Sequence, residues 1–270
     1  MAECRLCGAA LAPRFQLRVL GRHDVAYLCC VACGSLQTET PTWLDEAYQS
    51  NLADIDAGGV QRGLFNAAAC YAVARTLRLS HLLDFGGGDG WLCRMLRDHG
   101  LDAYVQDRYA IASYAQGYTQ PPFERPDLLS AFEVIEHFAQ PREELGRLLA
   151  ARPRQVLLST QLYSNQGPDW WYLVPETGQH VFFYSRRCLE AFAAQYGYRF
   201  AACGAYVLLS QSGEARGLRH WLVRRLLLRG IFLRLVLAWL CVRPARGAWR
   251  DLEVQRGRAA KDAPPSVRPR

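Results

Sequence analysis

The sequence is almost without lysine. Of its 32 basic residues only Lys261 is a lysine, so a phosphate-binding loop of the Gly-Lys-Ser/Thr type is excluded. An apolar leader is missing as well. The first residues, Met1 to Arg5, run into no apolar stretch, and we therefore expect no secretion signal and a cytoplasmic protein. These absences remove phosphate-loop nucleotide hydrolysis and a secreted, disulfide-stapled scaffold from the candidate classes.

Ten cysteines are present, and without a secretion signal we expect reduced thiols and metal ligands rather than disulfides. Four of them form two Cys-x-x-Cys pairs, each followed at once by glycine: Cys4, Cys7, Cys30 and Cys33. Glycine suits a tight turn that points backbone amides at thiolate sulfur. The two pairs predict a structural zinc site of the zinc-ribbon type over residues 1–40, with Cys29 and His23 as alternative ligands.

The net charge of +7 is concentrated at one end of the chain. Residues 216–270 carry 14 basic and 3 acidic residues, a local balance of +11, which leaves the rest of the chain at −4. A basic tail on a weakly acidic body gives poor support for a general nucleic-acid surface, and we expect no nucleic-acid partner.

Glycines cluster after a short apolar run. Residues 81–90 read His-Leu-Leu-Asp-Phe-Gly-Gly-Gly-Asp-Gly, and a helical pattern begins at Trp91. Glycine is needed where the backbone turns sharply and lies close to a ligand, because a Cβ would block the approach. A dinucleotide fingerprint that starts at Gly86 would need a further glycine where Trp91 stands, so the spacing excludes it.

The pattern that remains, Asp84-x-Gly86-x-Gly88-x-Gly90, resembles the first motif of class I S-adenosylmethionine-dependent methyltransferases. The resemblance covers about residues 80–200. It implies a Rossmann-like fold and S-adenosyl-L-methionine as the cofactor, with the glycine turn passing its methionine part. The residues that would position the cofactor are Asp84, Gly86, Gly88, Gly90, Asp107, Phe132 and Glu133.

Asp107 ends the next short strand pattern, a little over twenty residues after the first glycine. An acid at the tip of the second strand hydrogen-bonds the ribose hydroxyls in Rossmann-like folds. Taken alone, Asp107 would be an ordinary solvated loop acid. After the glycine turn we interpret it as the ribose ligand.

Strand and helix patterns alternate from residue 82 to about residue 200. Strands are expected at 82–85, 103–106, 128–132 and 156–160, and helices at 90–99, 142–151 and 185–196. This alternation predicts an α/β fold with a parallel sheet covered by helices on both faces. The expected organisation is a zinc-ribbon-like segment (1–40), a helical lead-in (41–80), a methyltransferase domain (81–215), a basic amphipathic helix (216–243) and a disordered tail (244–270).

Two acids and a histidine follow the strand pattern at 128–132. Glu133, Glu136 and His137 stand at i, i+3 and i+4, so a helical turn would place them on one face, where a proton or cation must separate the carboxylates. With the later His180, the pattern resembles metal-dependent O-methyltransferases that act on quinol rings and on the terminal ribose of small RNAs. The resemblance implies that these four residues hold a divalent cation, magnesium or manganese, which lowers the pKa of the attacked hydroxyl.

Two other interpretations of this cluster stay open. The sequence Glu-Val-Ile-Glu-His also occurs in class I methyltransferases without a metal, where His180 would act as a general base. Alternatively, His180 is a packed loop histidine. The candidate catalytic residues are therefore His180, Glu136 and His137.

An aromatic cluster, Trp170-Trp171-Tyr172, stands between loop-like segments near the expected site. Its rings would stack on a ring or a sugar, or form a lid without substrate contact. Further along, residues 218–242 mix apolar runs with arginines, and Arg234 interrupts the longest run. This segment is too short to span a bilayer. It predicts a helix that lies on the inner face of an anionic membrane, or one that packs on its own domain or a second subunit.

Together these motifs predict S-adenosylmethionine-dependent methyl transfer to a hydroxyl of a sugar, glycan or natural-product acceptor. The chain as a whole resembles bacterial zinc-ribbon methyltransferases associated with glycan or natural-product assembly. Two alternatives remain. One is an RNA 2'-hydroxyl methyltransferase that holds its substrate with the ribbon and the arginine tail. The other is a methyltransferase-like scaffold without turnover. The sequence does not indicate an oligomeric state.

Overall fold

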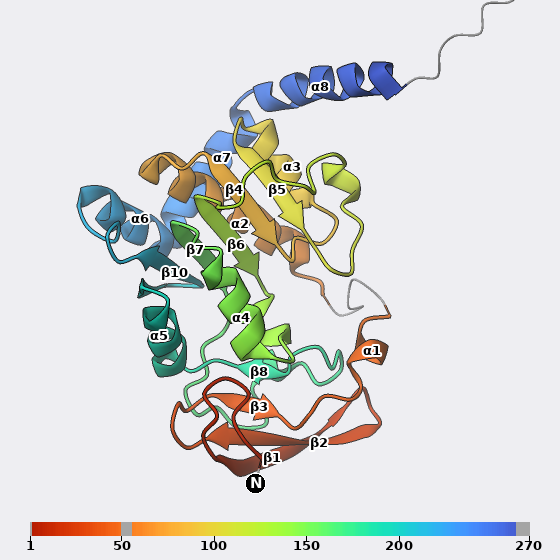
Figure 1. Cartoon of the computed structure of the whole chain (residues 1–270), viewed down its shortest axis with the longest axis vertical. Helices are drawn as coiled ribbons and strands as arrows, with labels where there is room; N and C mark the ends of the chain where they lie inside the picture. Colours follow the sequence, from red (N-terminus) through yellow and green to blue (C-terminus); the bar gives the residue numbers. More distant parts are fainter. Residues whose placement is uncertain (1, 50–55, 263–270) are drawn as a thin grey trace, which may run out of the picture.

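The computed structural model describes residues 2–49 and 56–262, which form two sheets with helices around the larger one (Figure 1). The strands are β1 (Leu11–Val19), β2 (His23–Cys30), β3 (Leu36–Thr38), β4 (His81–Phe85), β5 (Asp102–Gln106), β6 (Leu128–Phe132), β7 (Gln155–Ser159), β8 (Phe182–Phe183), β9 (Tyr198–Cys203) and β10 (Tyr206–Gln211). The helices are α1 (Leu44–Ala47), α2 (Gly59–Leu77), α3 (Trp91–Asp98), α4 (Pro141–Ala150), α5 (Arg186–Gln195), α6 (Leu218–Leu228), α7 (Gly230–Val242) and α8 (Arg246–Asp262). Short 3-10 turns are η1 (Ser113–Ala115), η2 (Ile135–His137) and η3 (Trp171–Leu173).

The larger sheet has the strand order β5-β4-β6-β7-β10-β9. Strands β5, β4, β6 and β7 are parallel, whereas β10 runs antiparallel to both of its neighbours. The predicted Rossmann-like α/β fold is confirmed. The expectation of a purely parallel sheet is corrected at β9 and β10, because a connection of two residues joins them and allows only an antiparallel hairpin.

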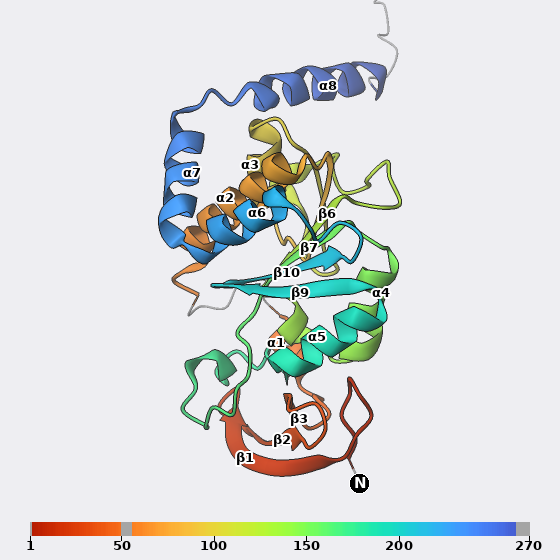
Figure 2. The ribbon, with the colours of Figure 1, turned by 90° about the vertical axis from the view of Figure 1, so that its left-hand side faces the viewer.

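Apolar residues that alternate along the strands of this sheet pack into two separate cores, one on each face. Leu82, Leu157 and Leu208 face one core, together with residues of α2, α3, α6 and α7. Leu83 and Leu158 face the other core, which α4 and α5 cover. Successive side chains of a strand point to opposite faces, so a strand buried on both sides needs apolar residues throughout. Figure 2 shows these helices on either side of the sheet.

The N-terminal sheet has the order β1-β2-β3-β8 and is antiparallel. Its last strand comes from far along the chain: Leu36 is paired with Phe183 and Gln37 with Phe182. Residues 1–40 therefore do not complete a sheet alone. In Figure 1 the arrows of β4, β5 and β6 point toward this sheet, so the carboxyl ends of the parallel strands face it.

The C-terminal part differs from the prediction in two ways. The single helix expected over 216–243 is two helices, because Arg229 leaves the helical conformation (φ −112°, ψ 100°) just before Gly230. The expected disordered tail is also corrected, since residues 246–262 form helix α8. The final residues, 263–270, lie outside the described part of the chain. No helix within residues 2–49 and 56–262 is long and apolar enough to cross a membrane.

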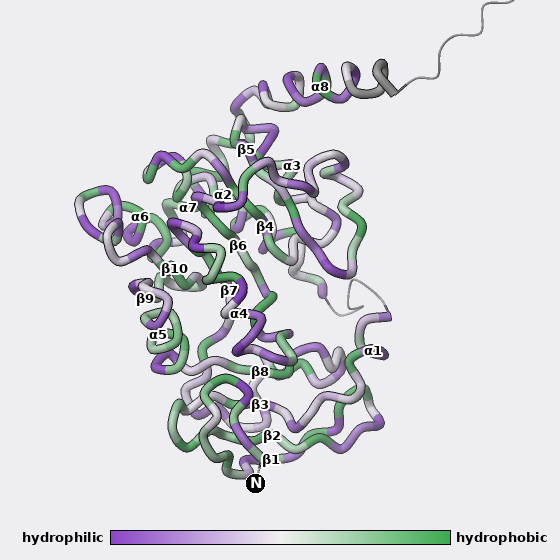
Figure 3. The backbone as a smooth tube through the Cα atoms, in the orientation of Figure 1, coloured by the Kyte–Doolittle hydropathy of each residue, from purple (hydrophilic) through white to green (hydrophobic). Residues whose placement is uncertain are grey.

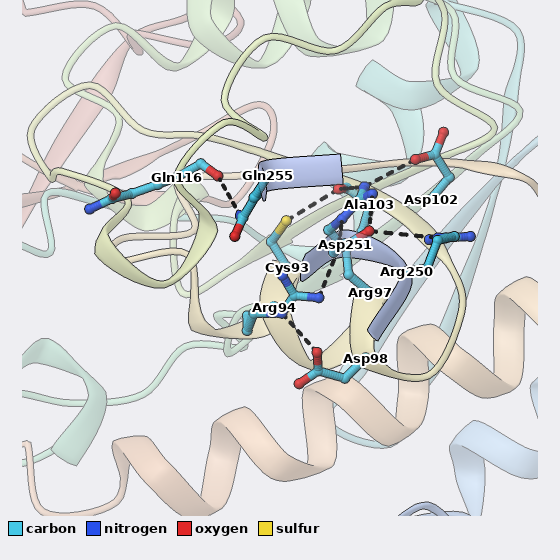
Figure 4. Close-up of polar contacts among 10 residues, drawn as sticks. All are labelled: Cys93, Arg94, Arg97, Asp98, Asp102, Ala103, Gln116, Arg250, Asp251 and Gln255. Carbon is cyan, nitrogen blue, oxygen red and sulfur yellow. Dashed lines mark hydrogen bonds and ion pairs between the residues drawn. The ribbon is translucent and has the colours of Figure 1, made fainter. Parts of the chain in front are cut away.

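A buried carboxylate attaches α8 to α3 (Figure 4). Asp251, 2% exposed, accepts hydrogen bonds from Arg97 Nε at 2.6 Å, from a terminal nitrogen of Arg97 at 3.0 Å and from Arg94 at 2.8 Å. Burial alone would raise the pKa of Asp251, but the hydrogen bonds from Arg97 and Arg94 outweigh it and lower the pKa. Close packing completes the contact, because a Cβ at Gly247 would lie 1.8 Å from the carbonyl oxygen of Arg97.

We predict that Asp251→Asn lowers the free energy of unfolding by about 3 kcal/mol, because the buried guanidinium of Arg97 and the partly buried one of Arg94 lose their shared charge partner. The matched control is Asp98→Asn, which removes a partly exposed partner of Arg94 and should cost under about 1 kcal/mol. Urea unfolding of the full chain measures both. The folded pKa of Asp251 lies below the unfolded value, so its contribution is present above about pH 4 and is lost as pH falls through the folded pKa. Equal stability of the two variants at neutral pH would contradict this account.

Candidate functional site

The turn after β4 contains four glycines, and three of them lie in the left-handed region, with φ of +69° at Gly86, +54° at Gly88 and +78° at Gly90. Two of them are required by packing. A Cβ at Gly86 would lie 2.6 Å from Val134, and one at Gly90 would lie 2.7 Å from Ala115. A Cβ at Gly88 would meet no atom within 4 Å. Gly88 therefore leaves open space beside the turn.

That space belongs to a cavity of about 480 Å³ at the carboxyl ends of β4, β5 and β6. Its volume lies within the range of small-molecule and cofactor sites. Among the sequence-predicted residues, those that line it are Gly86, Gly88, Asp107, Glu133 and His137. Asp84, Gly90 and Phe132 are not part of its lining.

Asp107 connects the tip of β5 to the glycine turn. Its Oδ1 accepts hydrogen bonds from the backbone N–H groups of Tyr109 and Ala110, each at 2.8 Å. Its Oδ2 accepts from the N–H of Gly88 at 2.9 Å. The carboxylate is therefore held at the cavity wall by the backbone around it, next to the open face of Gly88.

Three residues predicted to position the cofactor do not line the cavity, and their contacts are with the turn, the sheet and α3. Asp84 is buried behind the turn, where the hydroxyl of Ser130 donates to it at 2.7 Å and burial raises the pKa of Asp84 to about 7. Phe132 packs edge-on against Tyr206, with ring centroids 5.9 Å apart. Gly90 is the N-terminal cap of α3. Any effect of these three on a ligand would pass through the turn or the sheet.

Sequence reasoning missed an aromatic wall on the other side of the cavity. Tyr48, directly after α1, stacks on Tyr109 with ring centroids 4.8 Å apart. The hydroxyl of Tyr48 also forms a hydrogen bond of 2.7 Å with Nδ1 of His137. Both tyrosines line the cavity. Tyr48 belongs to the helical lead-in, where no motif marked it.

Glu133 lies at a strained corner after β6. Its φ of +53° is unfavourable for a residue with a Cβ, and such strain often accompanies function. The hydroxyl of Ser159 accepts from the Glu133 N–H at 3.0 Å and donates to its Oε1 at 2.7 Å. The hydroxyl of Tyr172 donates to Oε2 at 3.0 Å. These contacts hold the carboxylate at one orientation.

Glu136, His137 and His180 form a compact group, in which one potential ligand atom of each residue lies within 4.8 Å of the others. The 3-10 turn η2 carries Glu136 and His137, while the loop before β8 supplies His180. Glu133 lies apart from this group, because its left-handed backbone breaks the helical turn assumed from the sequence. Tyr172 nevertheless connects the two acids, since its hydroxyl also lies 2.5 Å from Glu136 Oε1.

The donor atoms of this group are arranged for a cation or a proton. Glu136 Oε2 is buried without a hydrogen-bond partner among the described residues. His180 Nδ1 lies 2.7 Å from the carbonyl oxygen of Tyr172, so Nδ1–H donates and Nε2 is left as the acceptor. Such a second hydrogen bond fixes the tautomer that a ligating or basic histidine needs.

Burial controls the charges of the group. It raises the pKa of Glu136 well above the usual value, and the neighbouring Glu133 carboxylate raises it further. Burial lowers the pKa of His137 well below the usual value, with a second contribution from His180, and it lowers the pKa of His180 as well. Both imidazoles are therefore neutral at neutral pH, the form that can accept a proton or bind a metal.

A second cavity of about 410 Å³ lies beside the first, and Glu133 lines both. Its walls come from α2, the ends of β6 and β7, and the α6–α7 junction. The predicted aromatic cluster divides here. Trp170 is half-buried and packs against the core of the N-terminal sheet, and Tyr172 is buried next to both acids, whereas Trp171 is 70% exposed and lines the second cavity.

The four predicted cysteines converge at one end of the N-terminal sheet, with their sulfur atoms within 4.8 Å of one another. Cys4 Sγ lies 3.8 Å from Cys33 Sγ, and Cys7 Sγ lies 3.4 Å from Cys30 Sγ. Four thiolates around a zinc ion at 2.3 Å would stand about 3.8 Å apart, so the arrangement fits a tetrahedral metal site. The alternative ligands Cys29 and His23 are outside this group.

The N-terminal cysteine segment contacts the His180 loop through Arg5. This guanidinium donates to the carbonyl oxygen of Val181 at 2.5 Å and to that of Ala139 at 3.1 Å. The N–H of Val181 in turn donates to the carbonyl oxygen of Glu136 at 2.9 Å. The residues next to both histidines are therefore tied to the first cysteine pair.

A family model and several solved structures are similar to this chain. The family model described as a methyltransferase domain matches residues 60–202, more than half of the chain. No curated protein matches the sequence. Among solved structures, the magnesium protoporphyrin IX methyltransferase of Synechocystis PCC 6803 aligns at 16% identity over 63% of this chain and 90% of its own, with a TM-score of 0.40. An O-methyltransferase family protein from Burkholderia thailandensis aligns at 14% identity over 63% of this chain and 67% of its own, with a TM-score of 0.44.

The structural similarities are too distant to carry an argument about the acceptor. The family-model match stands independently of them, and it spans the glycine turn, Asp107, Glu133 and the two histidines. This chain therefore belongs to the S-adenosylmethionine-dependent methyltransferases.

Proposed function

We propose that this protein transfers the methyl group of S-adenosylmethionine to a hydroxyl of a small acceptor that occupies the second cavity. The observation that carries the proposal is the meeting of two cavities at Glu133. One cavity has the glycine turn and Asp107, and the other has an exposed aromatic wall. A transfer reaction needs its two reactants to meet at one point, and holding them in that geometry accounts for much of the acceleration.

The residues of the first cavity fit the cofactor. Gly88 presents backbone without a Cβ, and the Asp107 carboxylate beside it can accept hydrogen bonds from two ribose hydroxyls. Tyr48 and Tyr109 offer aromatic surface to a purine ring. When bound, S-adenosylmethionine supplies an activated methyl group on a sulfonium.

The second cavity fits a ring that carries hydroxyl groups, as in a sugar or a polyketide-like natural product. Trp171 provides an aromatic face for the apolar side of a ring. Gln61, Asn66 and Gln161 provide amides for hydroxyl groups. This mixture of apolar wall and few polar groups is typical of sites for small molecules.

We further propose that Glu136, His137 and His180 hold a divalent cation, magnesium or manganese. The support is the buried Oε2 of Glu136, which has no hydrogen-bond partner within the described part of the chain, beside two imidazoles that burial keeps neutral. None of these three residues lines the second cavity, so such an ion would bind an acceptor oxygen that extends past Glu133, and it would lower the pKa of that hydroxyl. Glu133 would contribute its negative charge to the ion from the wall between the cavities, where Ser159 and Tyr172 hold its carboxylate.

Finally, we propose that the four cysteines bind one structural zinc ion. Four thiolates fill the coordination sphere and leave no open position for a substrate. Because Arg5 stands between Cys4 and Cys7 and reaches the carbonyl groups of Ala139 and Val181, the zinc ion would also keep the histidine loop in place.

We predict that Gly88→Val blocks binding of S-adenosylmethionine, because its side chain would enter the cavity. The matched control is Gly197→Val, which has the same left-handed strain (φ +81°) and open surroundings but lies outside the cavity. Asp107→Ala should weaken binding by about 1–3 kcal/mol, roughly five- to 150-fold. Titration calorimetry measures all three. Parent-like affinity in Gly88→Val or Asp107→Ala would place the cofactor elsewhere. A parent protein that does not bind S-adenosylmethionine would instead favour the scaffold without turnover.

We predict one zinc ion per chain in protein purified without chelator. Cys4→Ser should lose it, whereas Cys29→Ser, outside the four-sulfur group, should keep it. Elemental analysis of the purified proteins distinguishes them. Turnover should fall in Cys4→Ser while the larger sheet stays folded, because Arg5 loses its anchor. A parent protein without zinc, or a Cys29→Ser variant that loses it, would refute the assignment.

We predict that chelation abolishes turnover and that magnesium or manganese restores it, with the zinc content of each sample measured to show that the cysteine site is intact. His180→Ala and His180→Gln should lose turnover by about a hundredfold and keep cofactor affinity. His220→Ala, at a histidine that lines neither cavity, is the control. If chelator leaves the parent active and His180→Gln is inactive, His180 would instead be a general base. Full activity in both His180 variants would leave it as scaffold.

A further inference from the structure

Helix α7 has an exposed apolar stripe along its outer face. Ile231 is 58% exposed, Leu235 59%, Trp239 45% and Val242 81%. Their spacing of four, four and three residues places them on one side of the helix. Leu233 and Leu240, on the opposite side, are buried in the core over α2. Figure 2 shows α7 along the outer edge of the molecule, with α2 inside it.

Helix α6 repeats this arrangement. Val223 and Leu227 are buried, while its exposed apolar residues are Leu218, Trp221, Leu222 and Leu228. Hydrophobic and hydrophilic residues alternate along the helix (Figure 3). Two neighbouring helices thus each cover the domain with one side and leave large apolar side chains on the other. We call the exposed side of residues 218–242 the α6–α7 face. An apolar surface of this kind usually marks an interaction site.

The charged residues of the α6–α7 segment are all positive. Residues 216–243 contain seven arginines and no acidic residue. Arg225 lies over the ring of Trp221, 5.3 Å from its centroid, and Arg243 lies over that of Trp239 at 4.6 Å. Arginine above exposed tryptophan combines a phosphate-binding group with a ring suited to the boundary between water and lipid.

The exposed apolar residues and the arginines together indicate what binds the α6–α7 face. A second copy packed through the same face would bring arginines against arginines, because a two-fold interface pairs a patch with itself. A nucleic acid would neutralise the arginines but leave the apolar stripe in water. An anionic bilayer satisfies both, since apolar side chains enter the acyl boundary while guanidinium groups stay with lipid phosphates.

We propose that the α6–α7 face binds the surface of an anionic lipid bilayer, with both helices lying in the plane of the membrane. The binding is peripheral, as expected from helices of 11 and 13 residues that are too short to span the hydrocarbon core. Each arginine near such a surface contributes electrostatic attraction that salt weakens.

The membrane contact has a consequence for the acceptor, and this step rests on the proposed function. The second cavity is walled by Leu227, Leu228, Gly230 and Leu233, at the junction of the same two helices. A bilayer against the α6–α7 face would therefore lie next to that cavity. The acceptor that fits this placement is a hydroxylated ring or glycan attached to a lipid chain, its polar end in the cavity and its chain in the membrane.

The test is sedimentation of the full-length protein with vesicles of phosphatidylcholine alone or mixed with phosphatidylglycerol. We expect binding to the anionic vesicles only, weakened by salt. The double variant Ile231→Glu, Leu235→Glu should reduce binding more than tenfold, whereas Val254→Glu, an exposed apolar site on α8, should not. Removing two charges with Arg225→Gln and Arg234→Gln should weaken binding about thirtyfold, from about 1 kcal/mol per arginine.

Cofactor titration of each variant shows that it is folded, because none of the altered residues lines either cavity. Absence of parent binding to anionic vesicles, or unchanged binding by the double glutamate variant, would overturn the proposal. So would a parent dimer that Leu235→Glu dissociates, since the occupant would then be a second copy. Vesicle binding requires no turnover, so binding without methyl transfer to any lipid-linked acceptor would count against the proposed function alone.

Discussion

The guanidinium of Arg5 is the contact on which the arrangement of the site depends. It donates to carbonyl oxygens of Thr38 in the N-terminal sheet, Ala139 after η2 and Val181 before β8. Burial lowers the pKa of Arg5 to about 10, so it remains charged at neutral pH. A charged group with several donors can join the end of β3 to the two loops that carry Ala139 and Val181. Loss of one carbonyl would leave a buried charge with fewer hydrogen bonds, which makes this junction sensitive to movement of the loops.

The pairing of β8 with β3 acts together with this contact. Because β8 follows the loop that carries Tyr172 and His180, completion of the N-terminal sheet also positions those side chains over the carboxyl ends of β6 and β7. Tyr172 then holds the two acids near each other although their charges repel. The cysteine segment is thus more than an appendage, because the small sheet and Arg5 hold the loop that carries Tyr172 and His180.

Much of the fold and of the first cavity could be predicted because the signals are local. A glycine turn between strand and helix, an acid at the next strand tip and two Cys-x-x-Cys pairs each require only a few neighbouring residues. The expectations that failed involve distant contacts. Helix α8 forms beyond the predicted boundary because Asp251 meets Arg94 and Arg97, more than 150 residues earlier in the chain. Glu133 leaves the assumed helical face because Ser159, on the next strand, fixes its backbone.

The sequence by itself determined the class of fold, the position of the glycine turn and of Asp107, and the identity of the four cysteines, since each is written in spacing and residue type. Only the tertiary structure decided which groups share a space. It placed Tyr48 and Tyr109 at the first cavity, separated Glu133 from Glu136, His137 and His180, and exposed Trp171 while burying Tyr172 beside it. The physical reason is that burial and proximity arise from packing between distant segments, whereas periodicity reports only what is near along the chain.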